Sequence, residues 1–232
     1  MKGLYLILDL GSLLVPLLFS FHPKIQFYKQ WKTVLPGMFI SGIIYLVWDV
    51  LFTQQGVWGF NPIYLIGIQI FNLPLEEVLF FFCIPYACLF THYTLTKIYP
   101  QLGLKQSTTS IVSLVYSILL LILIFAFSEQ DYTFVNAIVT LIIVWISYWF
   151  DAKILAKFFV TYLIILLPFF IVNGILTGSF IDNEVVWYNN LENTNLRIGT
   201  IPVEDTIYAF GMLLLPLFIA RFLERTVFRP KL

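Results

Sequence analysis

Long apolar segments separated by short polar ones dominate the pattern of this chain. Windows of about 20 residues, the length of helix that crosses the hydrocarbon core of a bilayer, predict seven spans. The predicted spans cover residues 3–21, 34–52, 73–95, 109–128, 133–150, 154–176 and 203–223. The apolar stretch 63–72 is too short to cross, so we expect an interfacial or re-entrant segment there. The N-terminal run has no small-residue cleavage site, which favours a retained first span over a removed signal peptide.

The composition agrees with this pattern. Of the 232 residues, 60% are hydrophobic and 11% are charged, and the mean hydropathy is +0.90. A soluble domain of this length could not bury so much apolar surface. We therefore predict an all-α, polytopic membrane helix bundle of about seven spans. No basic patch with interleaved aromatic residues is present, so no nucleic-acid partner is indicated.

The positive charges lie almost entirely on one side of the predicted bundle. If the seven spans alternate in direction, only Lys2 and Arg197 fall on the side of the N-terminus. Cytoplasmic loops are enriched in Lys and Arg, so we expect the N-terminus outside and the C-terminus in the cytoplasm of a bacterial cell. The cations on the cytoplasmic side are Lys24, Lys29, Lys32, Lys97, Lys105, Lys153, Lys157, Arg221, Arg225, Arg229 and Lys231.

The chain also contains an internal repeat. Its first three spans correspond to its last three, which predicts a first repeat at 1–107, a connector helix at 108–130 and a second repeat at 131–232. Three spans plus a connector restore the starting direction, so the repeats are parallel and related by an axis along the membrane normal. The matched residues are Phe21 and Phe150, Lys24 and Lys153, Thr53 and Thr177, Trp58 and Trp187, and Pro100 and Pro230.

An acidic motif opens the last span of each repeat. Residues 73–77 read Leu-Pro-Leu-Glu-Glu, and residues 201–205 read Ile-Pro-Val-Glu-Asp. Proline suits the first turn of a helix, and the helix dipole favours acids there by ~0.3–1 kcal/mol, so one motif alone would indicate only a helix start. Two copies at matched positions on the outer face indicate a shared site instead. The candidate catalytic carboxyls are Glu76, Glu77, Glu204 and Asp205.

Further polar residues lie in the first two spans of each repeat, near the outer ends. Asp9 and Asp49 of the first repeat align with Asn136 and Asn173 of the second. An acid within a span is costly unless it is partnered, so we expect hydrogen bonds between these aspartates and the motif glutamates. The alternative interpretation is that Asp9 and Asp49 lie at the membrane interface in contact with water, where they would need no such partners.

This arrangement suits acid–base chemistry on a cation. Clustered carboxyls in a site of low dielectric repel one another, so one keeps a proton to deliver while an ionised neighbour stabilises positive charge. Aromatic ring faces can add to that stabilisation, although the same rings also fit plain packing. The candidate cation-stabilising rings are Trp48, Phe80, Phe81 and Tyr208.

Other chemistries find no support in the sequence. Cys83 and Cys88 share one apolar segment and have no neighbouring ligands, so we interpret them as reduced packing residues. His22 and His92 lack a ligand set, so no metal is expected. No Gly-x-Gly-x-x-Gly follows a strand, and no flavin or nicotinamide cofactor is expected. The absence of an Asp-rich diphosphate motif disfavours a prenyltransferase, and the last span has no central lysine for a retinal.

The two motifs and the residues that follow them resemble a known family. Pro-Leu-Glu-Glu-Val-Leu-Phe-Phe at 74–81 and Pro-Val-Glu-Asp-Thr-Ile-Tyr-Ala-Phe at 202–210 are similar to the paired signatures of the membrane-integral lycopene cyclase domain family. The resemblance spans both repeats. It implies an enzyme, found as two subunits or as one fused chain, that closes the linear ends of lycopene to β-ionone rings without net redox change. Its acidic motif falls on Glu76, Glu77, Glu204 and Asp205, and it leaves the roles of Asp9 and Asp49 unsupported.

Ring closure requires a proton on C2 of the linear end, a cation at C1, attack by the C5=C6 alkene and loss of a proton from C6. We expect one of Glu76, Glu77 and Glu204 to be the general acid, with Glu77 or Glu204 favoured, and another carboxylate to be the base. No cofactor is required. The partners would be lycopene or another linear carotenoid, which enters from the bilayer, and membrane lipids.

Two alternatives stay open. A related carotenoid hydratase or an ε- or γ-cyclase would use the same C1 cation and give a different product. A small proton-coupled transporter would use the acids as a relay. Homo-oligomerisation and association with other carotenoid enzymes are open as well.

Overall fold

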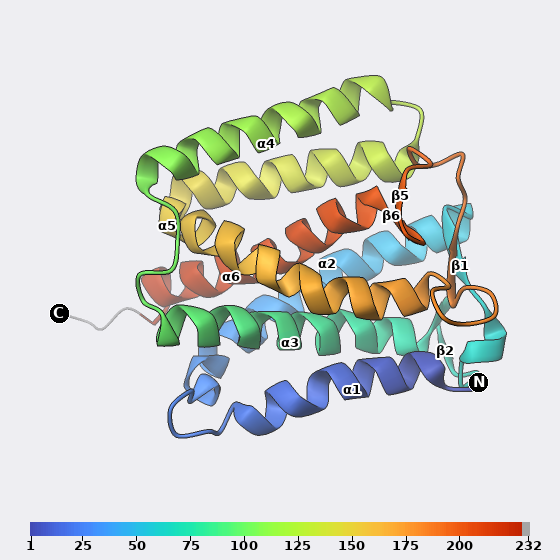
Figure 1. The fold of residues 1–232 in the computed structure, drawn as a ribbon, viewed down its shortest axis with the longest axis horizontal. Coiled ribbons are helices and arrows are strands. Elements are labelled where there is room, and N and C mark those ends of the chain that lie inside the picture. Colours follow the sequence, from blue (N-terminus) through green and yellow to red (C-terminus); the bar gives the residue numbers. More distant parts are fainter. Residues whose placement is uncertain (229–232) are drawn as a thin grey trace.

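The computed structural model describes residues 1–228, so Arg229, Pro230 and Lys231 of the sequence comparison lie outside the described residues. Helices dominate the described chain (Figure 1). They are α1 (Leu4–Phe19), α2 (Trp31–Gln55), α3 (Leu75–Ile98), α4 (Gln106–Ala126), α5 (Asp131–Leu176) and α6 (Val203–Thr226), with 3-10 turns η1 (Phe27–Gln30) and η2 (Pro62–Tyr64). The short strands are β1 (Trp58–Phe60), β2 (Gln69–Ile70), β3 (Leu73–Pro74), β4 (Val186–Tyr188), β5 (Arg197–Ile198) and β6 (Ile201–Pro202).

Helix α5 contains two of the predicted spans. A straight helix of its 46 residues would extend ~69 Å, more than twice the ~30 Å thickness of a hydrocarbon core. Its backbone leaves helical geometry at Asp151 (φ −161°, ψ 92°), and the chain turns back there (Figure 1). Counting the two halves of α5 separately, residues 1–228 form the seven-segment membrane helix bundle that the sequence predicts. The shortest segment is α1, with 16 residues.

Ion pairs connect the turn in α5 to the C-terminal end of α6. Oδ2 of Asp151 accepts hydrogen bonds from Nε of Arg221 at 3.0 Å and from Nη2 of Arg225 at 2.5 Å. Oδ1 of the same side chain accepts from the backbone N–H of Lys153 at 3.2 Å. The Asp151 side chain is only 7% exposed, so these two arginines compensate a nearly buried charge.

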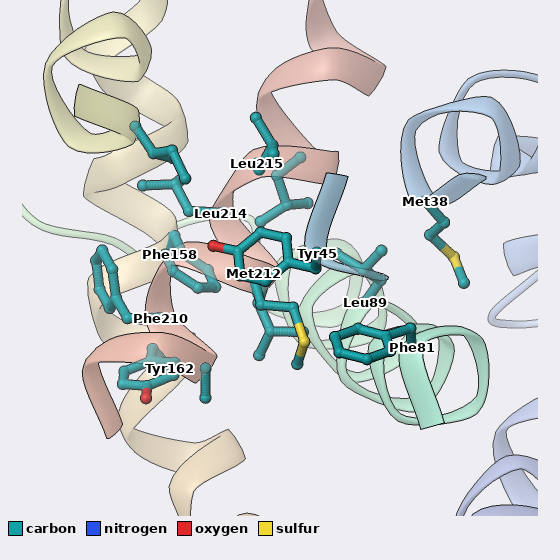
Figure 2. Packing of buried hydrophobic residues seen from close by; sticks show 14 of the residues in the cluster. Met38, Tyr45, Phe81, Leu89, Phe158, Tyr162, Phe210, Met212, Leu214 and Leu215 are labelled. Atoms are coloured by element: carbon teal, nitrogen blue, oxygen red, sulfur yellow. The ribbon is translucent and has the colours of Figure 1, made fainter. Parts of the chain in front are cut away.

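Helix α6 forms the centre of the bundle. Every residue from 209 to 217 is buried, as expected for a helix that is apolar on all sides and surrounded by other helices. Figure 2 shows Phe210 and Met212 of α6 among Tyr45 of α2, Phe81 of α3 and Phe158 of α5. This aromatic cluster joins helices from both halves of the chain.

Two short β-hairpins lead directly into the helices that begin with the acidic motifs. β2 pairs with β3, and β5 pairs with β6, so that Gln69 opposes Pro74 and Arg197 opposes Pro202. Each proline is the last residue before its helix, and the acids lie in the first turn of α3 and α6. The segment 63–72, predicted as interfacial, forms η2 and β2 at this end of the bundle. A third pair, β1 with β4, links the loops of the two halves.

Helices α2 and α6 approach closely at one glycine. A Cβ atom at Gly37 would lie 2.7 Å from the carbonyl oxygen of Pro216, whereas one at Gly11 of α1 would have no neighbour within 4 Å. Gly37→Ala should therefore force α2 and α6 apart and lower the free energy of unfolding by ~1–3 kcal/mol. Gly11→Ala should raise it by ~0.5–1 kcal/mol, because alanine favours a helix over glycine. Thermal unfolding in detergent measures both, and equal shifts would contradict the close contact.

Candidate active site

The acidic motifs meet at a pocket near the hairpin end of the bundle. Its volume is about 240 Å³, and it is lined by residues of the helices α1, α2, α3, α5 and α6 and of the strands β1 and β4. Three acids line it: Asp49, Glu77 and Asp205. Glu77 and Asp205 are the second acids of the two motifs, so the two halves of the chain contribute to one pocket.

Asp205 is surrounded by hydrogen-bond donors. Its Oδ1 accepts from the hydroxyl of Tyr132 at 2.6 Å. Its Oδ2 accepts from the side-chain amide of Asn173 at 2.7 Å and from the hydroxyl of Tyr188 at 3.0 Å. Three donors stabilise the ionised form of a buried carboxyl, because each compensates part of the hydration that the charge has lost.

Tyr188 lies on β4, outside the spanning segments, and stays a hydrogen-bond donor. Burial raises the pKa of its hydroxyl well above the ordinary value, and the nearby Asp205 carboxylate raises that pKa further. The proton therefore remains on the phenol oxygen, from which it is donated to Asp205.

Glu77 has fewer partners than Asp205. Its Oε2 accepts from the hydroxyl of Tyr5 at 2.6 Å, and no other hydrogen bond to its carboxyl forms within residues 1–228. The side chain is buried. Since a carboxyl with one donor gains little compensation for losing water, the neutral, protonated form suits Glu77 better than it suits Asp205.

Asp49 lies in the same pocket with an intermediate number of partners. Its Oδ1 accepts from Nε1 of Trp58 at 2.5 Å and, at the longer distance of 3.5 Å, from the hydroxyl of Thr53. Its Oδ2 is buried and has no partner among the described residues. Asp49 is thus buried beside the other acids, so its interpretation as a wetted interface residue is wrong. The expected hydrogen bond from Asp49 to a motif glutamate is wrong as well, because within residues 1–228 its partners are Trp58 and Thr53.

The first acid of each motif accepts a hydrogen bond from the backbone of the loop that precedes its helix. Oε1 of Glu76 accepts from the backbone N–H of Ile66 at 2.6 Å, and Oε1 of Glu204 accepts from that of Thr194 at 2.7 Å. In both cases the donor lies ten residues before the acid. Glu204 also accepts from the hydroxyl of Thr133 at 2.7 Å. Neither Glu76 nor Glu204 lines the pocket.

Asp9 differs from the expectation. It is fully buried, it does not line the pocket, and within residues 1–228 neither of its carboxyl oxygens has a hydrogen-bond partner. The predicted hydrogen bond from this residue to a motif glutamate is therefore wrong, and so is its interpretation as a wetted residue. Its aligned residue Asn136 donates to the backbone carbonyl of Glu204 at 2.8 Å.

The four candidate rings divide into two layers. Phe80 and Tyr208 line the pocket, whereas Trp48 and Phe81 do not. The Trp48 ring centroid lies 5.0 Å from that of Tyr208, and the Phe81 centroid lies 5.7 Å from that of Phe80. Trp48 and Phe81 thus support the rings that face the pocket.

Our sequence reasoning missed the tyrosines that hold the acids. Tyr5 precedes Asp9 by four residues, and Tyr132 precedes Asn136 by four, so the repeat alignment already paired these two tyrosines. Each donates a hydrogen bond of 2.6 Å to the second acid of the motif in its own half. The repeat alignment could not have indicated Tyr188, because the aligned position in the loop of the first repeat is not a tyrosine.

The fold and this pocket define a class: a polytopic membrane protein with buried carboxyls, tyrosines and an apolar cavity. A family model described as lycopene cyclase matches residues 2–95 and 129–223. The chain belongs to the lycopene cyclase family, as its motifs predicted, and this membership supports a carotenoid cyclase function in a membrane. No curated protein and no solved structure matched the chain significantly. Within residues 1–228, no group of three or more His, Cys, Asp or Glu side chains could hold a metal ion.

Glu204 offers a test of the loop-holding role. Glu204→Gln keeps a carbonyl oxygen for the Thr194 N–H and the Thr133 hydroxyl, whereas Glu204→Ala removes the acceptor. A buried donor without a partner costs ~1–3 kcal/mol, so we expect the Ala variant to lose at least that much of its free energy of unfolding and the Gln variant clearly less. Thermal unfolding in detergent compares them. Equal losses would show that the accepted hydrogen bonds do not explain the burial of this acid.

Proposed function

We propose that the protein is a lycopene β-cyclase in which Glu77 supplies the proton and Asp205 the compensating negative charge. The observation that carries the proposal is the unequal hydrogen bonding of two acids in one pocket. Asp205 accepts three hydrogen bonds and Glu77 accepts one. Two carboxyls whose surroundings favour opposite protonation states form an acid–base pair.

The pair accounts for each step of ring closure. Glu77 transfers its proton to C2, and the electrons of the C1=C2 bond form the new C–H bond, which leaves a tertiary cation at C1. The C5=C6 alkene attacks C1, so that a C1–C6 bond forms and the positive charge moves to C5. Loss of the C6 proton to Asp205 restores the C5=C6 double bond. Return of that proton to Glu77 completes the cycle, and the product is an isomer of the substrate.

The surroundings of the acids suit a carbocation. Phe80 and Tyr208 line the pocket, and the face of an aromatic ring stabilises positive charge, as it does for an ammonium group. A carbocation gives up a proton readily, so a weak base such as the hydrogen-bonded Asp205 suffices. The mainly apolar lining beyond the acids disfavours water, which supports ring closure over hydration.

We also propose the repeat organisation given by the sequence: residues 1–107 and 131–232 as parallel repeats and 108–130 as their connector. The matched bonds of Tyr5 to Glu77 and Tyr132 to Asp205 support it. The charge distribution supports an N-terminus outside and a C-terminus in the cytoplasm of a bacterial membrane.

Conservative replacements of the acids test the assignment. Glu77→Gln removes the transferable proton and should lower turnover of lycopene in membranes by about 10²–10⁴-fold, the usual contribution of a general acid. Asp205→Asn should also lower turnover strongly, because it removes the anion. Glu76→Gln is the matched control on the adjacent residue and should stay within about threefold of the wild type. An active Glu77→Gln beside an inactive Glu76→Gln would overturn the assignment.

The product identifies the reaction. In membranes that contain lycopene, the wild type should form a product of unchanged mass whose ring double bond lies between C5 and C6. Mass spectrometry and nuclear magnetic resonance check this. A mass increase equal to one water would indicate a hydratase, and a double bond at C4 or outside the ring would indicate an ε- or γ-cyclase.

A further inference from the structure

The pocket continues away from the acids along one face of α3. Residues of this helix line it from Glu77 to Thr91, fourteen positions further on, and a helix rises ~1.5 Å per residue, so the lined length is about 21 Å. Beyond the acids the lining is mainly apolar, with Ile84, Ala87 and Cys88 of α3 facing Ile165 of α5 and Met212 of α6. The pocket is therefore a slot that has its acids at one end.

The acid end of the slot is closed by contacts between helices. Leu4 and Tyr5 of α1 belong to one buried cluster with Leu176 of α5, and Leu8 and Val172 pack against it. Val185, next to β4, and Val186, in β4, belong to the same cluster. The end group of a ligand at Glu77 and Asp205 would thus lie against a closed wall.

Away from the acids, the slot opens toward the bilayer. Helix α1 and the second half of α5 converge near the N-terminus of the chain and diverge away from it, with α3 between them (Figure 1). Along these two helices, Ser12 and Pro16 of α1 and Phe169 of α5 are half-buried, and Pro168 of α5 is exposed. All four residues line the slot. The slot is therefore open on the outer surface of the helix bundle, the surface that lipid chains surround in a membrane.

We propose that this slot binds the polyene chain of a linear carotenoid, which enters end-first between α1 and the second half of α5. This inference rests on the proposed function and adds the binding site for the part of the substrate that does not react. A long, apolar slot suits an extended polyene without polar substituents, and burial of apolar surface provides the affinity. The rest of the molecule stays in the lipid.

The slot has a consequence for the order of products. One acid of each motif, Glu77 or Asp205, lines the same pocket, so one end of the substrate reacts at a time. The second end reaches the acids only after the chain leaves and re-enters in the opposite direction. A monocyclic product is therefore released to the bilayer before a bicyclic one forms.

Substitutions deep in the slot test the binding site without touching the acids. Thr91→Phe places a ring at the far end and should raise KM for a full-length linear carotenoid at least tenfold while kcat at saturation stays within about threefold. Its KM for a truncated polyene with the same end group should not change, because the shorter chain does not reach Thr91. Thr108→Phe on the exposed face of α4 is the control and should leave both substrates unaffected.

Ala87→Leu, nearer the acids, is the second slot variant and should raise KM for both substrates. Unfolding temperatures equal to that of the wild type show that the variants are folded. An unchanged KM for the full-length carotenoid in both slot variants would overturn the slot as the polyene-binding site and would leave the cyclase proposal intact. Failure of the wild type to cyclise either substrate would overturn the proposed function itself, so the two failures are distinguishable.

Discussion

The need to give a buried carboxyl hydrogen-bond partners inside a membrane helix bundle governs the arrangement of this protein. Asp205 obtains its three hydrogen bonds from the start of α5, from the end of α5 and from β4. Those donors can meet only if α5 reverses direction and if the loop that contains β4 lies over the end of the bundle. The turn at Asp151 and the pairing of β1 with β4 meet these two conditions.

The two acids of each motif have different structural roles. Glu76 and Glu204 hold the backbone of the preceding hairpin loops, and Glu77 and Asp205 face the pocket. The first acid thereby fixes the start of the helix on which the second acid lies. A doubled carboxyl motif thus combines a structural anchor with a carboxyl that lines the pocket, and this division applies in both halves of the chain.

The sequence predicted the helical segments well because apolar length and charge are local properties. The break at residue 151 falls between the predicted spans 133–150 and 154–176, although the backbone stays helical on both sides of it. The alignment of Asp49 with Asn173 also located residues that line the pocket. The expectation for Asp9 failed because a similar position along neighbouring helices does not by itself bring a donor within hydrogen-bond distance of its carboxyl.

The sequence by itself determined the class, the spans, the motifs and the family, since these depend on residue type, spacing and the length of apolar runs. Only the tertiary structure decided which acid of each motif faces the pocket. Adjacent residues on a helix point about 100° apart, so the rotation of α3 and α6 separates Glu77 from Glu76 and Asp205 from Glu204. That rotation is set by the packing of both helices against the rest of the bundle, and no local pattern contains it.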